Sequence, residues 1–133
     1  MPLLLDTCTF WWLSNKKNRA RLSEKAISLI KDSADDLFIS AISSFELGIK
    51  ITKGRLQLAE KLTAEEWFRE ALKTHGVIQV PINFQIASQT TQLPPIHNDP
   101  CDRMIIATAQ EYNMRILTPD KLISQYPQAK CVW

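Results

Sequence analysis

Four acidic residues, widely separated along this sequence, have the chemistry to hold a divalent cation together. Asp6, Glu46 and Asp120 each come after a short apolar segment, and Asp102 lies at an expected helix start. Carboxylates gathered in one cleft repel each other unless a cation neutralises them. A set made only of oxygen atoms suits Mg²⁺ or Mn²⁺ better than zinc. If the fold brings the four together, the pattern predicts a cation site able to support phosphoryl chemistry.

The first two acids also have ordinary local interpretations as helix-capping groups. Asp6, or Thr7 beside it, can cap the helix that follows a buried strand at residues 3–5. Ser43 and Glu46 have the spacing of a capping box. Taken singly, neither acid has to be functional.

The other two acids can be explained locally in the same way. Asp99 can cap a helix that has Pro100 in its first turn, which makes Asp102 a first-turn acid. Asp120 would similarly be a first-turn acid behind a Thr118 cap. Each acid alone is therefore accounted for, and only their position in the fold can make them a site.

Short apolar runs alternate with helical patterns along the chain. Strands are expected at 3–5, 37–39, 77–82 and 115–118, with a possible edge strand at 130–133. This alternation predicts an α/β fold with a parallel sheet, right-handed crossovers and helices on both faces. Because parallel strands end at one edge, all four acids would open onto that edge. Four acids in one place are not explained by capping.

Length and composition predict a single domain over residues 1–133. Hydrophobic residues make up 45% and charged residues 23%, the balance of an ordinary globular protein. The formal net charge of +2 is too small to indicate a nucleic-acid partner by itself. No apolar run approaches a membrane span and no signal peptide is recognisable, so we expect no membrane association and a cytoplasmic location.

The remaining polar residues give weaker indications. Three cysteines without paired spacing predict neither a disulfide framework nor a zinc site. His75 and His97 are expected on the surface or in loops. The basic segment 15–25, together with Lys50, Lys53 and Arg55, is expected to be solvated, with contact to RNA phosphates as the less favoured alternative.

Several blocks, in the same order along the chain, closely resemble the PIN-domain ribonuclease toxins of the VapC type. The matching blocks are Leu4-Leu5-Asp6-Thr7, Ser40 to Lys50 around Glu46, Gly54-Arg55-Leu56, Leu93 to Ala107, and Leu117-Thr118-x-Asp120. The resemblance implies a three-layer α/β/α PIN-like domain with a central parallel sheet of four to five strands. It also implies RNA cleavage with Mg²⁺ or Mn²⁺ held by acidic residues, a homodimer, and inhibition by a cognate antitoxin.

Carried over position by position, the resemblance makes Asp6, Glu46, Asp102 and Asp120 the metal-binding and catalytic acids. Asp102 is preferred to Asp99 because it directly precedes the apolar run 104–107, as the helix acid of the family does. Asp99 then becomes a cap or a group that supports a metal-bound water.

Three further residues are expected to support the acids. Thr7 and Thr118 are expected as hydroxyl partners of carboxylates or waters. Arg103 is expected to pair with Asp99, with contact to a substrate phosphate as the alternative.

Cys8 stands where similar sequences often have His, and its oxidation is hypothesised to impair the site.

The sequence therefore predicts a metal-dependent endoribonuclease, the toxin of a toxin–antitoxin pair, in which a metal-activated water attacks the phosphodiester. The alternative is a catalytically silent PIN-like module that acts by binding an antitoxin. A metal-dependent phosphatase with a nucleophilic Asp6 is disfavoured, because that chemistry requires a second Asp two residues later and position 8 is Cys.

Overall fold

The fold is built on one parallel five-stranded sheet. The computed structural model describes residues 1–34, 36–58 and 61–133. The strands are β1 (Leu3–Leu5), β2 (Leu37–Ser40), β3 (Ile78–Val80), β4 (Arg115–Leu117) and β5 (Cys131–Val132). They pair in the order β3-β2-β1-β4-β5, so that β1 is central and β5 is an edge.

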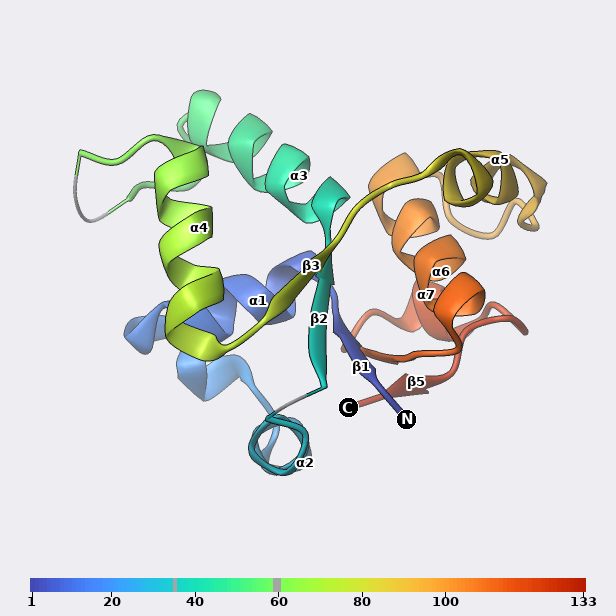
Figure 1. Ribbon diagram of the computed structural model, residues 1–133, viewed down its shortest axis with the longest axis horizontal. Helices are drawn as coiled ribbons and strands as arrows, with labels where there is room; N and C mark the ends of the chain where they lie inside the picture. Colours follow the sequence, from blue (N-terminus) through green and yellow to red (C-terminus); the bar gives the residue numbers. More distant parts are fainter. Residues whose placement is uncertain (35, 59–60) are drawn as a thin grey trace.

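Helices cover both faces of this sheet. They are α1 (Thr7–Ser14), the 3-10 helix η1 (Lys16–Arg21), α2 (Glu24–Asp32), α3 (Ala41–Thr52), α4 (Ala64–His75), α5 (Phe84–Gln92), α6 (Pro100–Tyr112) and α7 (Lys121–Ser124). Figure 1 shows α1 and α4 on one side of the sheet and α5 and α6 on the other. The α/β/α arrangement and the parallel sheet predicted from the sequence are confirmed.

Each face of the sheet has its own hydrophobic core. Leu3 and Leu5 point to a cluster formed with α1, α2 and α4, while Leu4 points to a cluster formed with α5 and α6. All three leucines are fully buried, as a central strand covered on both faces requires. Aromatic side chains of α1 and α4 pack in the first cluster, where Phe10 meets Trp67 edge-on and Trp11 lies 5.0 Å from Trp67 between ring centroids.

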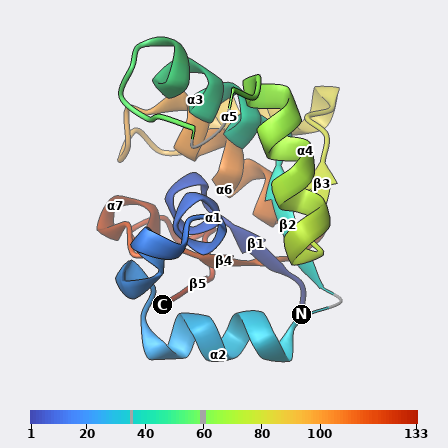
Figure 2. The same cartoon turned by 90° about the vertical axis from the view of Figure 1, so that its left-hand side faces the viewer.

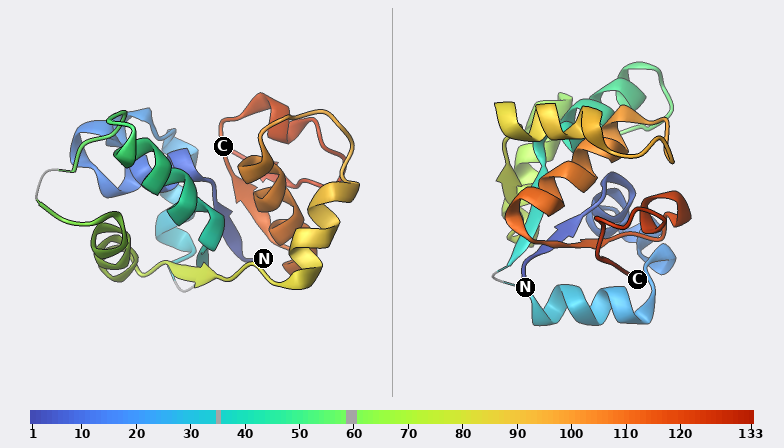
Figure 3. Two further views of the ribbon diagram at one scale, coloured as in Figure 1. Left: turned by 90° about the horizontal axis from the view of Figure 1, so that it is seen from above. Right: turned by 90° about the vertical axis from the view of Figure 1, so that its right-hand side faces the viewer.

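The strand register brings polar residues level with one another at the carboxyl edge. Leu5 is paired with Ile39 on β2 and with Leu117 on β4. The next residues along these strands, Asp6, Ser40 and Thr118, therefore lie side by side. Seen from above, α3 in teal and α6 in orange flank β1 at this edge (Figure 3, left). Figure 2 shows α2 at the opposite end of the molecule from α3.

Two helix starts differ from the sequence prediction. Helix α3 begins one turn earlier than expected because Ser40, and not Ser43, caps it by accepting from the Ile42 amide. The predicted capping box of Ser43 and Glu46 is therefore wrong.

The cap of α7 also differs from the sequence prediction. Asp120 itself accepts from the amides of Leu122 and Ile123, while the Thr118 hydroxyl accepts from the Asp120 amide. The Thr118 cap predicted for this helix is therefore wrong.

Within the residues that the structure describes, no helix is long and apolar enough to cross a membrane.

Candidate active site

The carboxyl edge of the sheet carries a pocket into which four acids open. This acid pocket has a volume of about 250 Å³ and is lined by Asp6, Thr7, Cys8, Trp12, Glu46, Asp102, Pro119 and Asp120. The four acids that the sequence singled out are thus neighbours in space. Asp6 and Asp120 cap α1 and α7, and Glu46 and Asp102 lie on α3 and α6.

Asp6 is the most buried of the four acids, with only 4% of its surface exposed. Its Oδ1 accepts from the Thr9 amide at 2.8 Å, which caps α1, and its Oδ2 accepts from the Thr118 hydroxyl. Asp6 is therefore both a cap and a member of the pocket, so the two interpretations of this residue are compatible. Its side chain is fixed at two oxygens by β4 and α1, which leaves little freedom of rotation.

Glu46 reaches the pocket from the second turn of α3. One oxygen, Oε2, lies 3.7 Å from Lys50 Nζ one turn later, while Oε1 is buried and has no hydrogen-bond partner among the described residues. Ser43, the expected partner of Glu46, instead shares a 2.8 Å hydrogen bond with the Thr7 hydroxyl. Thr7 thus ties α1 to α3, and its hydroxyl contacts no carboxylate in the described part of the chain.

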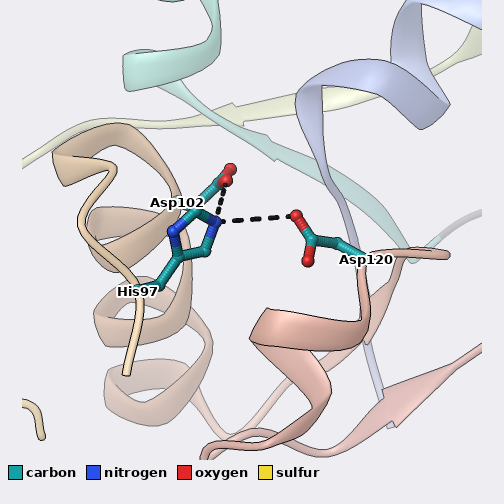
Figure 4. Close-up of side chains that lie close together, drawn as sticks. All are labelled: His97, Asp102 and Asp120. Atoms are coloured by element: carbon teal, nitrogen blue, oxygen red, sulfur yellow. Dashed lines mark ion pairs between the residues drawn. The ribbon is translucent and has the colours of Figure 1, made fainter. Parts of the chain in front are cut away.

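Asp102 and Asp120 face each other across a histidine (Figure 4). His97 Nε2 lies 2.8 Å from Asp102 Oδ2 and 3.6 Å from Asp120 Oδ2. The 2.8 Å contact is of ion-pair length, but its angles are not those of a hydrogen bond. The imidazole nevertheless lies between the two carboxylates, one from α6 and the other from the cap of α7 (Figure 4).

The orientation of the His97 ring indicates how its proton is placed. Nδ1 accepts from the Asp99 amide at 3.3 Å, so in the neutral ring Nε2 carries the hydrogen. A protonated Nε2 faces the two carboxylates and does not offer a lone pair to a cation. The sequence reasoning placed His97 in a loop but assigned it no part in the site. The available signal was its position two residues before Asp99 within the block that resembles the family.

The roles expected for Asp99 and Arg103 are only partly found. Asp99 caps α6 by accepting from the Cys101 amide at 2.8 Å, and its carboxylate lies within 4.8 Å of ligand atoms of Glu46 and Asp102. Arg103 does not pair with Asp99, so that prediction is wrong. Its guanidinium points away and donates to the carbonyl oxygens of residues 90, 93, 94 and 97 and to the Tyr126 hydroxyl.

Burial and the charges of neighbouring acids oppose ionisation of Asp6 and Asp102. Burial raises the pKa of Asp102 to about 7, helped by the charges of Asp99 and Glu46 and opposed by His97. Burial also raises the pKa of Asp6, although hydrogen bonds from Thr118 and Thr9 act against this. A cluster whose carboxylates resist ionisation is one that a cation would stabilise.

The residues present fit a hard divalent cation. The pocket offers carboxylate oxygens from four elements, and the buried Glu46 Oε1 without a partner is an oxygen that a cation would satisfy. Carboxylate oxygens of Glu46, Asp99 and Asp102 lie within 4.8 Å of one another, and those of Asp102 and Asp120 form a second such group with His97, whose Nε2 hydrogen faces them. Asp102 belongs to both groups, which places it at the centre of the site.

Comparison with known proteins identifies the family. The PIN domain family model matches residues 3–128. The chain belongs to the PIN-domain family. Its resemblance to the VapC-type members, predicted from the sequence, is confirmed by ribonuclease VapC22 of Mycobacterium tuberculosis, which is 33% identical over 135 residues and covers 98% of both chains.

Solved structures of similar fold are also found. A DNA-bound VapBC complex from Salmonella typhimurium contains a chain with a TM-score of 0.70 and 20% identity, covering 99% of this chain and 97% of that one. A toxin–antitoxin complex from Klebsiella pneumoniae gives a TM-score of 0.64 at 22% identity, with 98% and 96% coverage. At these identities the likeness concerns the fold.

Proposed function

We propose that this single PIN-like domain is a metal-dependent endoribonuclease that acts as the toxin of a toxin–antitoxin pair. The observation that carries the proposal is the acid pocket, where Asp6, Glu46, Asp102 and Asp120 converge at the carboxyl edge of the sheet. The kinship with a VapC ribonuclease supports the same reaction class. No Ser or Cys nucleophile paired with a base is needed, since water is the attacking group.

Asp6, Glu46, Asp102 and Asp120 would hold Mg²⁺ or Mn²⁺. When bound, such an ion polarises a phosphate oxygen, makes water a better nucleophile and stabilises the leaving oxygen. The chain keeps its acids in place through Thr118, which donates to Asp6, and through His97, which lies between Asp102 and Asp120. Asp99 caps α6 and so fixes the start of the helix that carries Asp102.

The decisive experiment is cleavage of a mixed cellular RNA pool by purified protein free of any partner. We expect discrete cuts with Mg²⁺ or Mn²⁺ and none with EDTA. Asp6→Asn and Asp102→Asn are expected to lower the rate at least about 100-fold, because each removes a charge that holds the cation. Glu70→Gln is the matched control, since Glu70 is an exposed acid on α4 and should leave cleavage unchanged.

The alternative function is that of a catalytically silent module. Folded protein that cleaves no RNA with either metal, while still binding a partner protein, would favour that alternative. Cleavage that persists in both Asn variants would instead point to a contaminating nuclease and remove the support for the acid pocket as the active site.

We further propose a cognate antitoxin and a homodimer as the assembly partners. Similar folds are found in toxin–antitoxin complexes, which supports the first. Large exposed apolar side chains support both, because Phe84 is 85% exposed and Phe45 on α3 is 60% exposed. Light scattering of the purified chain, with Phe45→Ser and Phe84→Ser as separate variants, tests which of these surfaces joins two copies.

A further inference from the structure

A second pocket adjoins the acid pocket and is lined by residues other than the four acids, although Lys50 in its lining pairs with Glu46. This side pocket has a volume of about 290 Å³ and lies between α1, η1 and α3; its lining includes Trp11, Trp12, Asn18, Arg21 and Lys50. Thr7, Cys8 and Trp12 line both pockets, so the two are adjacent. A chain of nucleotides that enters the acid pocket would therefore pass next to the side pocket.

The groups that line the side pocket are of the kinds that bind single-stranded nucleic acid. Trp12 supplies a partly exposed indole ring, and Arg21 and Lys50 supply positive charge. Aromatic or guanidinium planes pack against bases, and cations track the phosphate backbone. The volume is near the lower end of that of small-ligand sites, which suits one nucleoside.

Two of these groups are not committed to partners within the described part of the chain. Arg21 has no carboxylate within ion-pair distance there, and its guanidinium lies over Trp12 at 5.8 Å from the ring centroid. Asn18 Oδ1 has no hydrogen-bond partner there either. An arginine and an amide without partners beside an indole indicate a place where a ligand supplies the missing contacts.

We infer that the side pocket holds the base and ribose of the nucleotide next to the scissile phosphate in single-stranded RNA. The inference rests on the proposed function and adds to it the residues that bind the substrate. Trp12 and Arg21 present the planes against which the base packs. Asn18 meets the edge of the base, and Lys50 lies between the two pockets, near the backbone phosphate.

RNA fits this pocket better than a segment of a partner protein does. A base is planar and uncharged, so it can pack near four carboxylates, while its flanking phosphates meet Arg21 and the cation site. The neighbouring segment 16–25 carries five cations and one acid, which complements a polyanion rather than an apolar helix. The side pocket has Asn18, Arg21 and Lys50 in its lining, whereas the hollow beside Phe45 and Ile49 has one cation, Lys53.

The test is a binding measurement that does not depend on cleavage. Fluorescence anisotropy with labelled 12-nucleotide oligo-U and oligo-A, and with an abasic strand of equal length, is recorded in EDTA. We expect Trp12→Leu to weaken binding of the two base-bearing strands about 5- to 20-fold and of the abasic strand less than about 2-fold. Arg21→Gln should weaken all three, and Lys73→Gln, an exposed cation on α4 that lines neither pocket, should change them little.

Trp12 also packs against Trp133 at 5.9 Å, so circular dichroism must show that Trp12→Leu is folded. If Trp12→Leu is not folded, Arg21→Gln tests the pocket instead, because Arg21 is exposed. Unchanged RNA affinity in folded variants would overturn the inference and leave the pocket to a protein partner. Base-dependent binding without any cleavage would instead count against the proposed nuclease and support the subsite, so the two failures are distinguishable.

Discussion

At the scale of single residues, Asp6 and Asp102 are held in an environment that disfavours their charge. Asp102 is the clearest case, because burial raises its pKa to about 7, well above its ordinary value. Asp99, Glu46 and Asp120 add to this by repulsion, and His97 opposes it. The charge of Asp102 therefore lowers the stability of the metal-free protein, and a bound cation would offset this effect.

The pH dependence of stability follows from this shift. In the unfolded chain Asp102 ionises near pH 4, while in the folded protein it ionises near pH 7, so the folded state binds more protons between these values. Metal-free protein should therefore lose stability as the pH rises from about 4 to 7. We expect Asp102→Asn to raise the melting temperature in EDTA by roughly 3–6 °C at pH 8 and to change it little at pH 4. Equal effects at both values would contradict the raised pKa.

Cys8 gives a second prediction at this scale. Burial, followed by the charge of Asp6, raises the pKa of the Cys8 thiol to about 11, so that about one thiol in ten thousand is ionised at pH 7. Oxidants attack the thiolate, so Cys8 should react slowly although part of its surface is exposed to solvent. We expect peroxide to inactivate the parent protein and Cys8→Ser at the same rate. Selective protection of Cys8→Ser would restore the hypothesis that oxidation here regulates the site.

At the scale of elements, Arg103 holds the connection from α5 to α6 in place. Its two terminal nitrogens donate to four carbonyl oxygens between residues 90 and 97, and to the Tyr126 hydroxyl, which also accepts from the His97 amide. All five acceptors are uncharged. Arg103 thus positions the segment that delivers His97 and Asp99 to the acid pocket.

Replacing Arg103 by Lys should therefore affect both stability and activity. Lysine cannot reproduce the planar fork of donors, and several buried carbonyl oxygens would lose their partners. We expect a loss of about 2–3 kcal/mol in the free energy of unfolding and a lower cleavage rate at temperatures where the variant is folded. Arg69→Lys, at an exposed pair with Glu65, is the control for a simple change of cation. A variant as stable as the parent would show that the contacts contribute little.

The sequence allowed the fold to be predicted because its signals are local. The fully apolar run Leu3 to Leu5 and the alternation of strands and helices determine a parallel sheet, and a parallel sheet has one carboxyl edge for all its acids. Partners from distant segments could not be predicted in this way. Ser43 pairs with Thr7, and Arg103 with the chain before α6, through contacts that no spacing in the sequence indicates. A single histidine such as His97 likewise forms no periodic pattern in the sequence, so its place in the site could not be predicted from periodicity.

At the scale of the whole molecule, the acid pocket is where the two helical layers meet above the sheet. Asp6 caps α1 and Glu46 lies on α3, beside the first hydrophobic cluster, while Asp102 lies on α6 and Asp120 caps α7, beside the second. Repulsion among these carboxylates acts between the two layers. A divalent cation bound by both should therefore stabilise the entire fold and not only the site.

The expected result is a melting temperature that depends on divalent cations. At Mg²⁺ or Mn²⁺ about 100-fold above its dissociation constant, stabilisation should approach about 2.7 kcal/mol, or roughly 5–10 °C, and EDTA should reverse it. Asp6→Asn and Asp102→Asn should lose most of this shift, one from each layer, while the exposed Glu70→Gln keeps it. A shift that all three variants retain would mean that the ion binds elsewhere. Loss of the melting-temperature shift in both Asp6→Asn and Asp102→Asn would show that carboxylates from the two layers act as one site, which is what metal-dependent cleavage requires.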